Sequence, residues 1–206
     1  MKHASNGMRT RIASWLAAAV LPWAALSTQA QQTSAAPNAA TAKVPIGGKF
    51  ALADASGKLV TDKTYIGKWQ LIFFGFTSCP DVCSTVMAEV AAALAELGPD
   101  AARIQPLFIT MDPERDTAER ISEYLNAFDS RIVGLRGSQA QTEQAIKAFH
   151  VYSKQRQTGK GYTLDHSALL YWMKPDGSFG KLLSGDSGGH RLGSELRATL
   201  LQGHAS

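Results

Sequence analysis

The segment at residues 69–76 is the feature that most limits how this chain can fold. It reads Trp-Gln-Leu-Ile-Phe-Phe-Gly-Phe, which is almost entirely apolar, and Thr-Ser-Cys-Pro-Asp-Val-Cys follows it directly. A strand that is covered on both faces reads as a nearly continuous apolar run. We therefore predict a central strand of a sheet that delivers Cys79 and Cys83 to the start of a helix, with Pro80 at the first helical position.

Strand-like and helix-like segments alternate along the rest of the chain. Strands are expected at residues 50–53 and 58–61, which flank an Asp-Ala-Ser-Gly turn, and at residues 104–111, 132–135, 151–155, 168–173 and 179–183, with a Gly-containing loop between 155 and 168. Helices are expected at residues 84–97, at 138–149 with Ser138 as N-cap, at 192–202, and from a cap at Asp116 or Thr117 to about residue 128. This order predicts an α/β fold with a mixed sheet, helices on both of its faces and a small N-terminal hairpin.

The first thirty residues predict export. A basic start with Lys2, Arg9 and Arg11 precedes an apolar core at residues 12–26, and Thr-Gln-Ala at 28–30 resembles a cleavage site. A membrane span needs about 20 apolar residues, so a cleaved signal is preferred and a retained anchor is the alternative. Residues 31–43 have the composition of a flexible linker, residues 44–206 are expected to form the folded domain, and no later stretch is expected to cross a membrane.

The charge of the chain gives no sign of a nucleic-acid partner. The chain has 21 basic and 17 acidic side chains, and three of the basic ones lie within the export signal. The remaining charges nearly balance, and the basic residues form no block. We therefore expect no nucleic-acid partner, and contact with a membrane only if the N-terminal segment is retained.

The two cysteines are expected to carry the chemistry of this protein. Residues four apart on a helix share one face, so two sulfurs at this spacing can close on one soft metal ion or on each other. An exported protein meets an oxidising compartment. A structural disulfide, however, gains most by closing a long loop, and Cys79 and Cys83 close almost none. Metal binding or reversible redox chemistry is therefore preferred to a structural disulfide.

Three motifs together resemble the SCO/SenC family of copper proteins. They are Phe-Thr-Ser-Cys-Pro-Asp-Val-Cys at 76–83, Met-Asp-Pro-Glu-Arg-Asp-Thr at 111–117, and Tyr-Thr-Leu-Asp-His-Ser-Ala at 162–168, with Pro-Asp-Gly following at 175–177. They stand in the family's order and spacing, and the resemblance runs from about residue 44 to residue 202. It implies a thioredoxin-like fold with a longer connection before the second half of the sheet. One departure is Ser-Thr-Val at 84–86, where the family often has a proline or an acidic residue; it bears on partner specificity rather than on metal binding.

The resemblance also implies a site and a role. Members of the family bind one copper ion through two cysteines and a distant histidine, which correspond here to Cys79, Cys83 and His166. They are implicated in building the dinuclear copper centre of cytochrome c oxidase subunit II. Two thiolates and an imidazole suit Cu(I) and, with a further ligand, Cu(II), whereas a structural zinc site prefers four protein ligands. We therefore expect one copper ion, Cu(I) or Cu(II), per chain.

His166 is one of four histidines that follow residue 30. It precedes the strand expected at 168–173, and in a thioredoxin-like fold the loop before that strand faces the cysteine turn. Ordinary thioredoxins carry a cis-proline there, whereas this chain has Leu-Asp-His-Ser at 164–167. The resemblance thus implies a metal ligand in place of the proline. His150 is expected at the end of a helix, and His190 and His204 are expected to be exposed.

Other side chains near the motifs have two interpretations each. Asp81, between the cysteines, is either a carboxylate at a helix N-terminus or a docking residue for a partner. Asp112 and Asp116 are expected in a turn and at a helix cap, with Asp112 at the cysteine end of the sheet. Asp165 either accepts a hydrogen bond from His166 or is solvated. Three methionines are expected to pack in the core rather than to bind a metal: Met87, Met111 and Met173.

We predict a periplasmic copper-delivery protein, a metallochaperone in the first place, whose partner is cytochrome c oxidase subunit II. A second periplasmic copper chaperone is the expected donor. The alternative is a thiol–disulfide oxidoreductase that reduces the cysteines of that subunit or acts in redox signalling, because a Cys79 thiolate at a helix N-terminus would have a lowered pKa. Two weaker hypotheses are a copper sensor in a redox response and a peroxiredoxin-like peroxidase, whose upstream Pro-x-x-x-Thr-x-x-Cys pattern is missing from the sequence.

Overall fold

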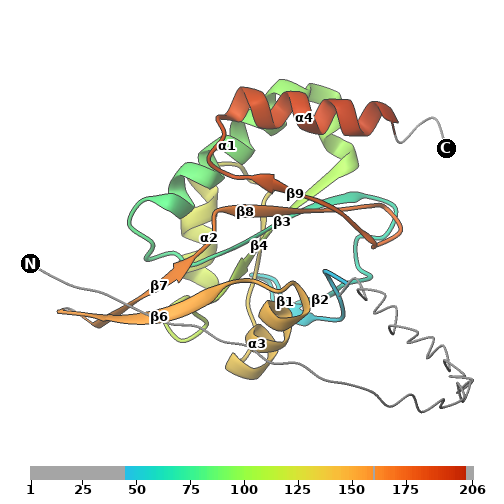
Figure 1. Cartoon of the computed structure of the whole chain (residues 1–206). Coiled ribbons are helices and arrows are strands. Elements are labelled where there is room, and N and C mark those ends of the chain that lie inside the picture. The colour runs from blue at the N-terminus through green and yellow to red at the C-terminus, as the bar shows by residue number, and fades with distance from the viewer. Residues whose placement is uncertain (1–44, 160, 203–206) are drawn as a thin grey trace, which may run out of the picture. The chain divides into compact units, whose positions relative to one another are not determined.

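Strand β3 (Trp69–Gly75) is buried at every residue and lies in the middle of a five-stranded sheet (Figure 1). The computed structural model, which describes residues 45–159 and 161–202, thus confirms the central strand that the apolar run predicts. The export signal and the linker expected at residues 1–43, together with His204, lie outside the described residues.

The remaining elements follow the predicted alternation closely. The other strands are β1 (Ala51–Ala53), β2 (Leu59–Thr61), β4 (Ile104–Thr110), β5 (Val133–Leu135), β6 (Ser153–Thr158), β7 (Gly161–His166), β8 (Leu169–Met173) and β9 (Phe179–Ser184). The helices are α1 (Val82–Leu97), the 3-10 helix η1 (Gly98–Arg103), α2 (Ala118–Asn126), α3 (Gln139–Ala148) and α4 (Gly189–Gln202). Ser138 caps α3 as predicted, in a capping box with Gln141.

The sheet has the strand order β5-β4-β3-β8-β9 and is mixed. Strands β3, β4 and β5 run parallel, with Phe73 opposite Phe108. Strand β8 pairs antiparallel with β3, and β9 pairs antiparallel with β8. Both parallel steps move in the same direction across the sheet, so their right-handed crossovers place α1 and α2 on the same face. The predicted mixed sheet is confirmed, and so is the N-terminal hairpin of β1 and β2.

Helices α1, α2 and α4 cover one face of the sheet, and α3 with the β1–β2 hairpin covers the other (Figure 1). On the first face, Phe73 packs against Phe108, whose ring also contacts Tyr124 of α2. On the second face, Phe74 packs against Phe149, which follows α3. Adjacent residues of β3 therefore face two apolar layers, which explains why this strand reads as an apolar run rather than as an alternating pattern.

Helix α1 is a core helix. Together with η1 it forms a stretch, Val82–Arg103, that contains an 18-residue window with a mean hydropathy of 1.3 and is long and apolar enough to cross a membrane by length and composition. The expectation that no later stretch passes this test is therefore wrong. The apolar side chains along the helix, among them Val86, Met87, Val90 and Leu94, are buried in the core, which accounts for the composition of this stretch.

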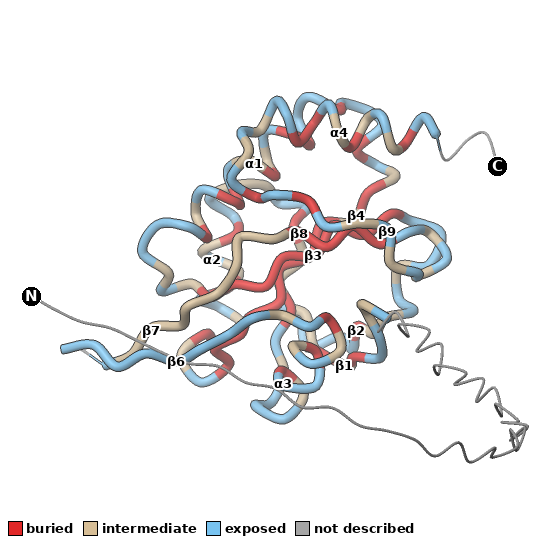
Figure 2. The backbone as a smooth tube through the Cα atoms, in the orientation of Figure 1, coloured by how far each residue is buried: buried red, intermediate tan, exposed pale blue. Residues whose placement is uncertain are grey.

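Strands β6 and β7 form a separate two-stranded hairpin, which we call the His166 hairpin because β7 ends at that residue. The prediction of a loop between residues 155 and 168 is wrong, because β7 forms most of this segment. Every residue of β6 is exposed, and Figure 2 shows this strand in the colour of exposed residues while the central strands are buried. The strand expected at residues 151–155 is confirmed in part, because β6 begins at Ser153 and continues to Thr158. The sequence Ser-Lys-Gln-Arg-Gln-Thr at 153–158 has no apolar alternation, so its pattern gave no signal for this extension.

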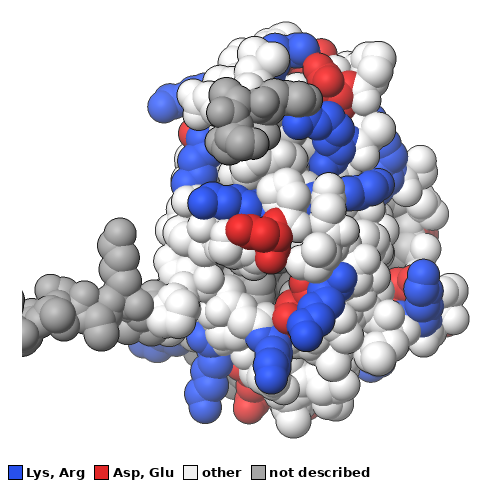
Figure 3. Space-filling model, turned by 90° about the vertical axis from the view of Figure 1, so that its right-hand side faces the viewer, with Lys and Arg blue, Asp and Glu red and all other residues white. Residues whose placement is uncertain are grey.

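The surface away from the His166 hairpin carries mixed charge. Figure 3 shows basic side chains spread over this face with acidic side chains between them. Mixed charges of this kind are typical of a solvated surface. A nucleic-acid site would instead gather basic residues into a stripe or patch.

Candidate metal centre

Strand β3 ends at Gly75, next to the point where α1 begins. A Cβ atom at Gly75 would lie 2.7 Å from a ring carbon of Phe73 and 3.1 Å from Sγ of Cys83. A larger residue would therefore have to push its neighbours apart. Glycine inside a strand often marks such a close approach, and here it lets the first turn of α1 bring Cys83 onto the sheet.

Residues 76–81, which we call the cysteine loop, connect β3 to α1. The helix starts at Val82 with Asp81 as its N-cap, so Pro80 precedes the cap and is not the first helical residue that the sequence predicted. Cys79 lies in the loop and is half-buried, whereas Cys83 lies in the first turn of α1 and is fully buried. The backbone N–H of Cys83 donates to Sγ of Cys79 at 3.4 Å. The two thiols are therefore neighbours, although only Cys83 is helical.

His166 comes to the same place from the end of β7. Its ring stands edge-on to the rings of Phe73 and Phe76, with centroids 5.9 Å and 5.7 Å away. Its Nδ1 atom lies 3.2 Å from the carbonyl oxygen of Ser167. With Nδ1–H donating to this carbonyl, Nε2 keeps the lone pair that a metal ligand needs.

Three donor atoms meet at this point. Nε2 of His166 lies 3.3 Å from Sγ of Cys83 and 3.9 Å from Sγ of Cys79, and all three atoms lie within 4.8 Å of one another. Metal–sulfur bonds of about 2.3 Å and metal–nitrogen bonds of about 2.0 Å would span such separations. Within the described residues, this is the one group of Cys, His and acidic side chains placed to hold a metal ion. The residues that the resemblance implied are thus brought together.

The two thiols differ in their affinity for a proton. The Cys83 thiol donates to the sulfur of Cys79, and this bond, assisted by His166 and by the Cys83 backbone N–H, lowers the pKa of Cys79 to about 4 although burial opposes the shift. The pKa of Cys83 is raised, because its proton is shared with Cys79 and because the thiol is buried. In the dithiol without metal, Cys79 is therefore the thiolate, and closing both sulfurs on a metal ion releases the proton of Cys83.

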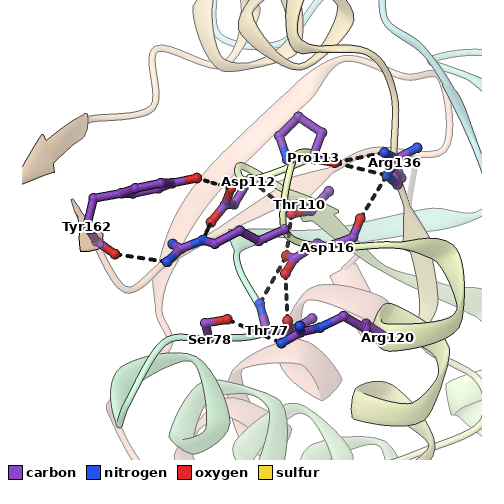
Figure 4. Close-up of polar contacts among 10 residues, drawn as sticks. Thr77, Ser78, Thr110, Asp112, Pro113, Asp116, Arg120, Arg136 and Tyr162 are labelled. Carbon is purple, nitrogen blue, oxygen red and sulfur yellow. Dashed lines mark hydrogen bonds and ion pairs between the residues drawn. The ribbon is translucent and has the colours of Figure 1, made fainter. Parts of the chain in front are cut away.

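Asp116 fixes the cysteine loop. It is fully buried and accepts hydrogen bonds from the backbone N–H of Thr77 at 3.0 Å, the hydroxyl of Thr77 at 2.6 Å and the hydroxyl of Thr110 at 2.6 Å (Figure 4). The sequence left the cap of α2 open between Asp116 and Thr117. The cap is Thr117, whose hydroxyl accepts from the backbone N–H of Arg120, so the carboxylate of Asp116 is free to hold the loop.

Residues 111–117, which we call the bridging loop, also contact the His166 hairpin. Arg115 forms an ion pair with Asp112 and donates from Nη1 to the carbonyl oxygen of Tyr162 at 2.9 Å. The hydroxyl of Tyr162 donates to Asp112 at 2.8 Å (Figure 4). Asp112 lies just after β4, where the sequence predicted a turn, and its side chain is buried, which the sequence did not predict. Sequence reasoning did not single out Thr77, Arg115 or Tyr162, although the three motifs contain all of them.

A cleft of about 230 Å³ opens beside Cys79 and His166. Its other lining side chains are both apolar and charged: Phe76, Pro80, Asp81, Val82, Arg156, Thr163, Leu164 and Asp165. Cys83 does not line it. The donor group is therefore open on the side of Cys79 and His166 and closed on the side of Cys83.

The family model described as SCO1/SenC matches residues 38–201. The chain belongs to the SCO1/SenC family. It is 39% identical over 141 residues to "Protein SCO1 homolog, mitochondrial" of Homo sapiens, covering 65% of this chain and 46% of the relative. It is 38% identical over 141 residues to "Protein SCO1 homolog 1, mitochondrial" of Arabidopsis thaliana, covering 68% of this chain and 42% of the relative. The chain thus spans less than half the length of these curated relatives.

Solved structures of SCO1/SenC proteins share the fold. The copper-bound ScoI of Bradyrhizobium japonicum is 42% identical to this chain with a TM-score of 0.70, and the match covers 74% of this chain and 98% of that one. The resemblance to the SCO/SenC family and the thioredoxin-like fold that it implied are therefore confirmed.

Two acidic candidates lie beside the SCO1/SenC donor group without joining it. Asp165 pairs with Arg156 at 2.8 Å, and its carboxylate therefore stabilises the hairpin instead of orienting His166. Asp81 is exposed, and its side chain forms no capping hydrogen bond within the described residues, while its carbonyl oxygen accepts from the hydroxyls of Ser84 and Thr85. The carboxylate of Asp81 is thus left facing solvent near the cleft.

The other histidines and the methionines are placed as predicted where they are described. His150 follows Phe149, the C-cap of α3, with a φ of 52°, and its Nε2 lies 3.3 Å from the carbonyl oxygen of Pro45. His190 is exposed, with Nδ1 3.2 Å from a carboxylate oxygen of Glu96. Three methionines are buried in the core: Met87, Met111 and Met173.

Proposed function

We propose that this protein binds one copper ion per chain through Cys79, Cys83 and His166 and delivers it to the dinuclear copper centre of cytochrome c oxidase subunit II. The observation that carries the proposal is the approach of two sulfurs and one imidazole nitrogen to within 4.8 Å, from a loop, a helix and a hairpin. Membership of the SCO1/SenC family supports it, because copper is bound in ScoI of Bradyrhizobium japonicum. The resemblance to the family also implies a role in oxidase assembly.

The donor set favours copper over zinc. Thiolates are soft ligands that select Cu(I), and two of them with an imidazole give a low coordination number that Cu(I) accepts. A structural zinc site closes with four protein ligands, and the donor group among the described residues offers three. Cu(II) would take a further ligand from the open side, where the cleft lies.

The residues of the site divide the work of loading and release. The Cys79 thiolate is ready to bind at neutral pH, because its pKa is lowered to about 4. Cys83 gives up its proton when it binds, which couples affinity to pH. The cleft beside Cys79 and His166 gives a partner's ligands a route to the bound ion, as delivery requires.

We infer that the protein works in the periplasm. The export signal expected at residues 1–30 supports this placement, and the domain expected at residues 44–206 is then the part that carries copper. A second periplasmic copper carrier would supply the ion. If the N-terminal segment is retained as an anchor, the domain faces the periplasm from the membrane.

Copper stoichiometry tests the site. The reduced protein is expected to bind one copper ion per chain and the disulfide form essentially none, because the thiolate is the ligand and the disulfide removes both thiolates. The Cys79→Ser/Cys83→Ser double variant is the matched control and should stay empty in either redox state. Equal copper contents of the reduced and oxidised wild type would refute the assignment.

The low pKa of Cys79 also favours a second function, reduction of a partner disulfide. The Cys79 thiolate would attack one sulfur of the partner's disulfide, forming a mixed disulfide and releasing one partner thiolate. Cys83 would then give up its proton to the released partner thiolate and attack the Cys79 sulfur, which releases the second partner sulfur as a thiolate. Two electrons pass to the partner, and this protein is left with a Cys79–Cys83 disulfide.

Strains that carry single variants separate the two functions. A pure reductase should tolerate His166→Ala, which leaves the dithiol intact, whereas a copper carrier that uses three ligands should fail to assemble the oxidase centre. Added copper should partly rescue a carrier defect by mass action, and an added thiol reductant should rescue a reductase defect. Normal oxidase activity of the His166→Ala strain at limiting copper would reject delivery in favour of reduction.

A further inference from the structure

The His166 hairpin packs against the core mainly through Leu164 and the ring of His166, at its inner end. All six residues of β6 are exposed, and β7 is only half-buried from Tyr162 onward. Within the described residues, the two strands pair with each other and add no strand to the main sheet. A two-stranded hairpin on its own is marginally stable in water. The place of His166 relative to the thiols is therefore set by whatever ties this hairpin to the rest of the domain.

Three side chains form such a tie, and we call them the latch: Asp112, Arg115 and Tyr162. Arg115 bonds to the carboxylate of Asp112 through Nε and to the carbonyl oxygen of Tyr162 through Nη1, at 2.9 Å for the carbonyl. Its guanidinium also lies over the ring of Tyr162, 3.9 Å from the centroid. The hydroxyl of Tyr162 donates back to Asp112 at 2.8 Å. The latch therefore contacts β7 through the backbone carbonyl, the ring and the hydroxyl of Tyr162.

The other side of the bridging loop grips the cysteine loop. Asp116, next to Arg115 in sequence, accepts both hydrogen bonds that fix Thr77, two residues before Cys79. The guanidinium of Arg115 lies 5.9 Å from the ring centroid of Phe76, the first residue of the cysteine loop. One short loop therefore contacts both parts of the donor group.

We propose that Arg115 is a positioning residue that holds the His166 hairpin so that the imidazole reaches both thiols. The inference deepens the proposed function and rests on it where copper is concerned. Arg115 contacts none of the three donor atoms and acts on them through Tyr162. Without it, the hairpin keeps its own strand pairing but loses its main polar attachment, so the thiol pair stays in place while His166 moves more freely.

The arrangement requires arginine rather than any cation. The planar guanidinium presents several N–H donors in a fixed fork and stacks on an aromatic ring, whereas lysine is a point charge on a flexible stem. One flat group thus satisfies Asp112, the Tyr162 carbonyl and the Tyr162 ring together. Arg115→Lys should therefore keep the attraction to Asp112 but restore the hairpin only in part.

Hydrogen exchange in the reduced, metal-free protein tests the latch without copper. Arg115→Met should speed amide exchange in β6 and β7 by roughly tenfold or more, since a hydrogen bond to a charged group and a cation–π contact are lost together. Exchange in β3 and α1 should not change. Arg131→Met is the matched control, because among the described residues the Arg131 guanidinium pairs with the nearby Asp129, between α2 and β5 and away from the hairpin.

Copper affinity tests whether Arg115 acts through His166. Arg115→Met should weaken Cu(II) binding by roughly tenfold or more while Cu(I) binding changes far less, because two thiolates can hold Cu(I) alone. In a His166→Ala background, Arg115→Met should have no further effect on Cu(II). An effect of equal size in both backgrounds would overturn the positioning role.

A milder variant covers the case in which Arg115→Met fails to fold. Tyr162→Phe keeps the ring and the backbone carbonyl but removes the hydroxyl that donates to Asp112. It should speed hairpin exchange by a smaller factor, about threefold to tenfold. Tyr152→Phe, at an exposed tyrosine before β6, is its control and should have no effect.

The two proposals fail in different ways. Unchanged hairpin exchange in a folded Arg115→Met protein and in Tyr162→Phe would overturn the role of Arg115, whatever copper does. A wild-type protein that binds no copper would refute the proposed function, and the exchange experiment would still decide whether Arg115 holds the hairpin.

Discussion

The two parts of the donor group are held by different means. Cys79 and Cys83 follow a strand that is buried at every residue, and Cys83 is itself part of the core. His166 lies on a hairpin whose other strand is exposed along its whole length. The thiol pair is therefore placed by the same packing that folds the domain, whereas the imidazole is placed by a few contacts that could be lost without unfolding it.

This difference assigns separate tasks to the two regions. The core side fixes the geometry of a dithiol, which is enough for Cu(I) or for redox chemistry. In the copper site that we propose, the hairpin side would add the nitrogen that Cu(II) needs. Variants on the core side should therefore affect both oxidation states of copper and the stability of the domain, and variants on the hairpin side should affect Cu(II) alone.

The largest expected effect comes from removing one donor on each side. Cys83→Ser should lower the affinity for both Cu(I) and Cu(II) by more than about a hundredfold. Loss of a direct ligand should exceed the roughly 10–100-fold cost of losing a residue that only supports a ligand. His166→Ala should lower the affinity for Cu(II) by a similar factor and leave the affinity for Cu(I) nearly unchanged. Competition titrations in each oxidation state measure this.

Equal losses of Cu(I) affinity in His166→Ala and Cys83→Ser would contradict the difference between the core side and the hairpin side. The hairpin would then be as essential to the site as the core. His150→Ala serves as the control, because that histidine lies beyond the C-terminal end of α3, where it contacts Pro45. It should change the affinity for neither Cu(I) nor Cu(II).

The next effect concerns stability on the core side. Asp116→Ala should lower the free energy of unfolding by about 3 kcal/mol, because it leaves the Thr77 N–H and the Thr110 hydroxyl without their buried acceptor. Asp100→Ala, at an exposed carboxylate 3.8 Å from Arg197, should cost less than about 1 kcal/mol. Denaturant unfolding of both variants provides the measurement, and equal losses would contradict the buried role of Asp116.

Thiol alkylation compares the two cysteines directly. In the reduced metal-free protein, a small alkylating agent should modify Cys79 at least about a hundred times faster than Cys83 at pH 7, because Cys79 is a thiolate there and the raised pKa of Cys83 leaves it protonated. A lowered pKa also sets the sign of the pH dependence. The rate at Cys79 should stay flat between about pH 6 and pH 8 and fall as the pH drops through about 4.

Mass spectrometry of the alkylated protein identifies the modified residue. A rate at Cys79 that rises tenfold per pH unit between pH 6 and pH 8 would show an ordinary thiol and contradict the hydrogen bond from Cys83.

The smallest expected effect is a difference in stability between two glycine-to-alanine variants, one on the core side and one in the hairpin. Gly75→Ala should destabilise the domain by about 1–3 kcal/mol, because the added methyl group meets Phe73, Phe108 and Cys83 at 2.7–3.1 Å. Gly159→Ala in the hairpin has no heavy atom within 4 Å of the added Cβ and should change stability by less than about 0.5 kcal/mol. Thermal unfolding measures the stability of both variants. Equal losses of stability would contradict the difference between the packed core side and the open hairpin.

The sequence predicted the core side much better than the hairpin side. The apolar run at 69–76 and the cap at Ser138 are local signals, and both correspond to what the structure contains. Strand β6 is polar throughout, so only its first residues fell within an expected strand, at 151–155. Strand β7 was expected as a loop, although Tyr162 and Leu164 alternate with polar residues along it.

The donor group was predicted through its motifs, but the contacts that support it were not. Asp116 holds Thr77 across 39 positions, and Arg115 bonds to Tyr162 across 47 positions. Propensity and spacing describe neighbours along the chain, so a carboxylate before a helix was expected as a cap of that helix. Only the folded arrangement reveals that it holds the cysteine loop instead.

The unequal exposure of the two cysteines has a consequence for the order in which ligands exchange. Cys79 lines the open cleft, while Cys83 is fully buried behind it. In the delivery that we propose, an acceptor's ligand would reach the ion from the cleft, so the bond to Cys79 would be exchanged early and the bond to Cys83 last. The buried sulfur would then keep the ion attached until the acceptor has supplied its own ligands.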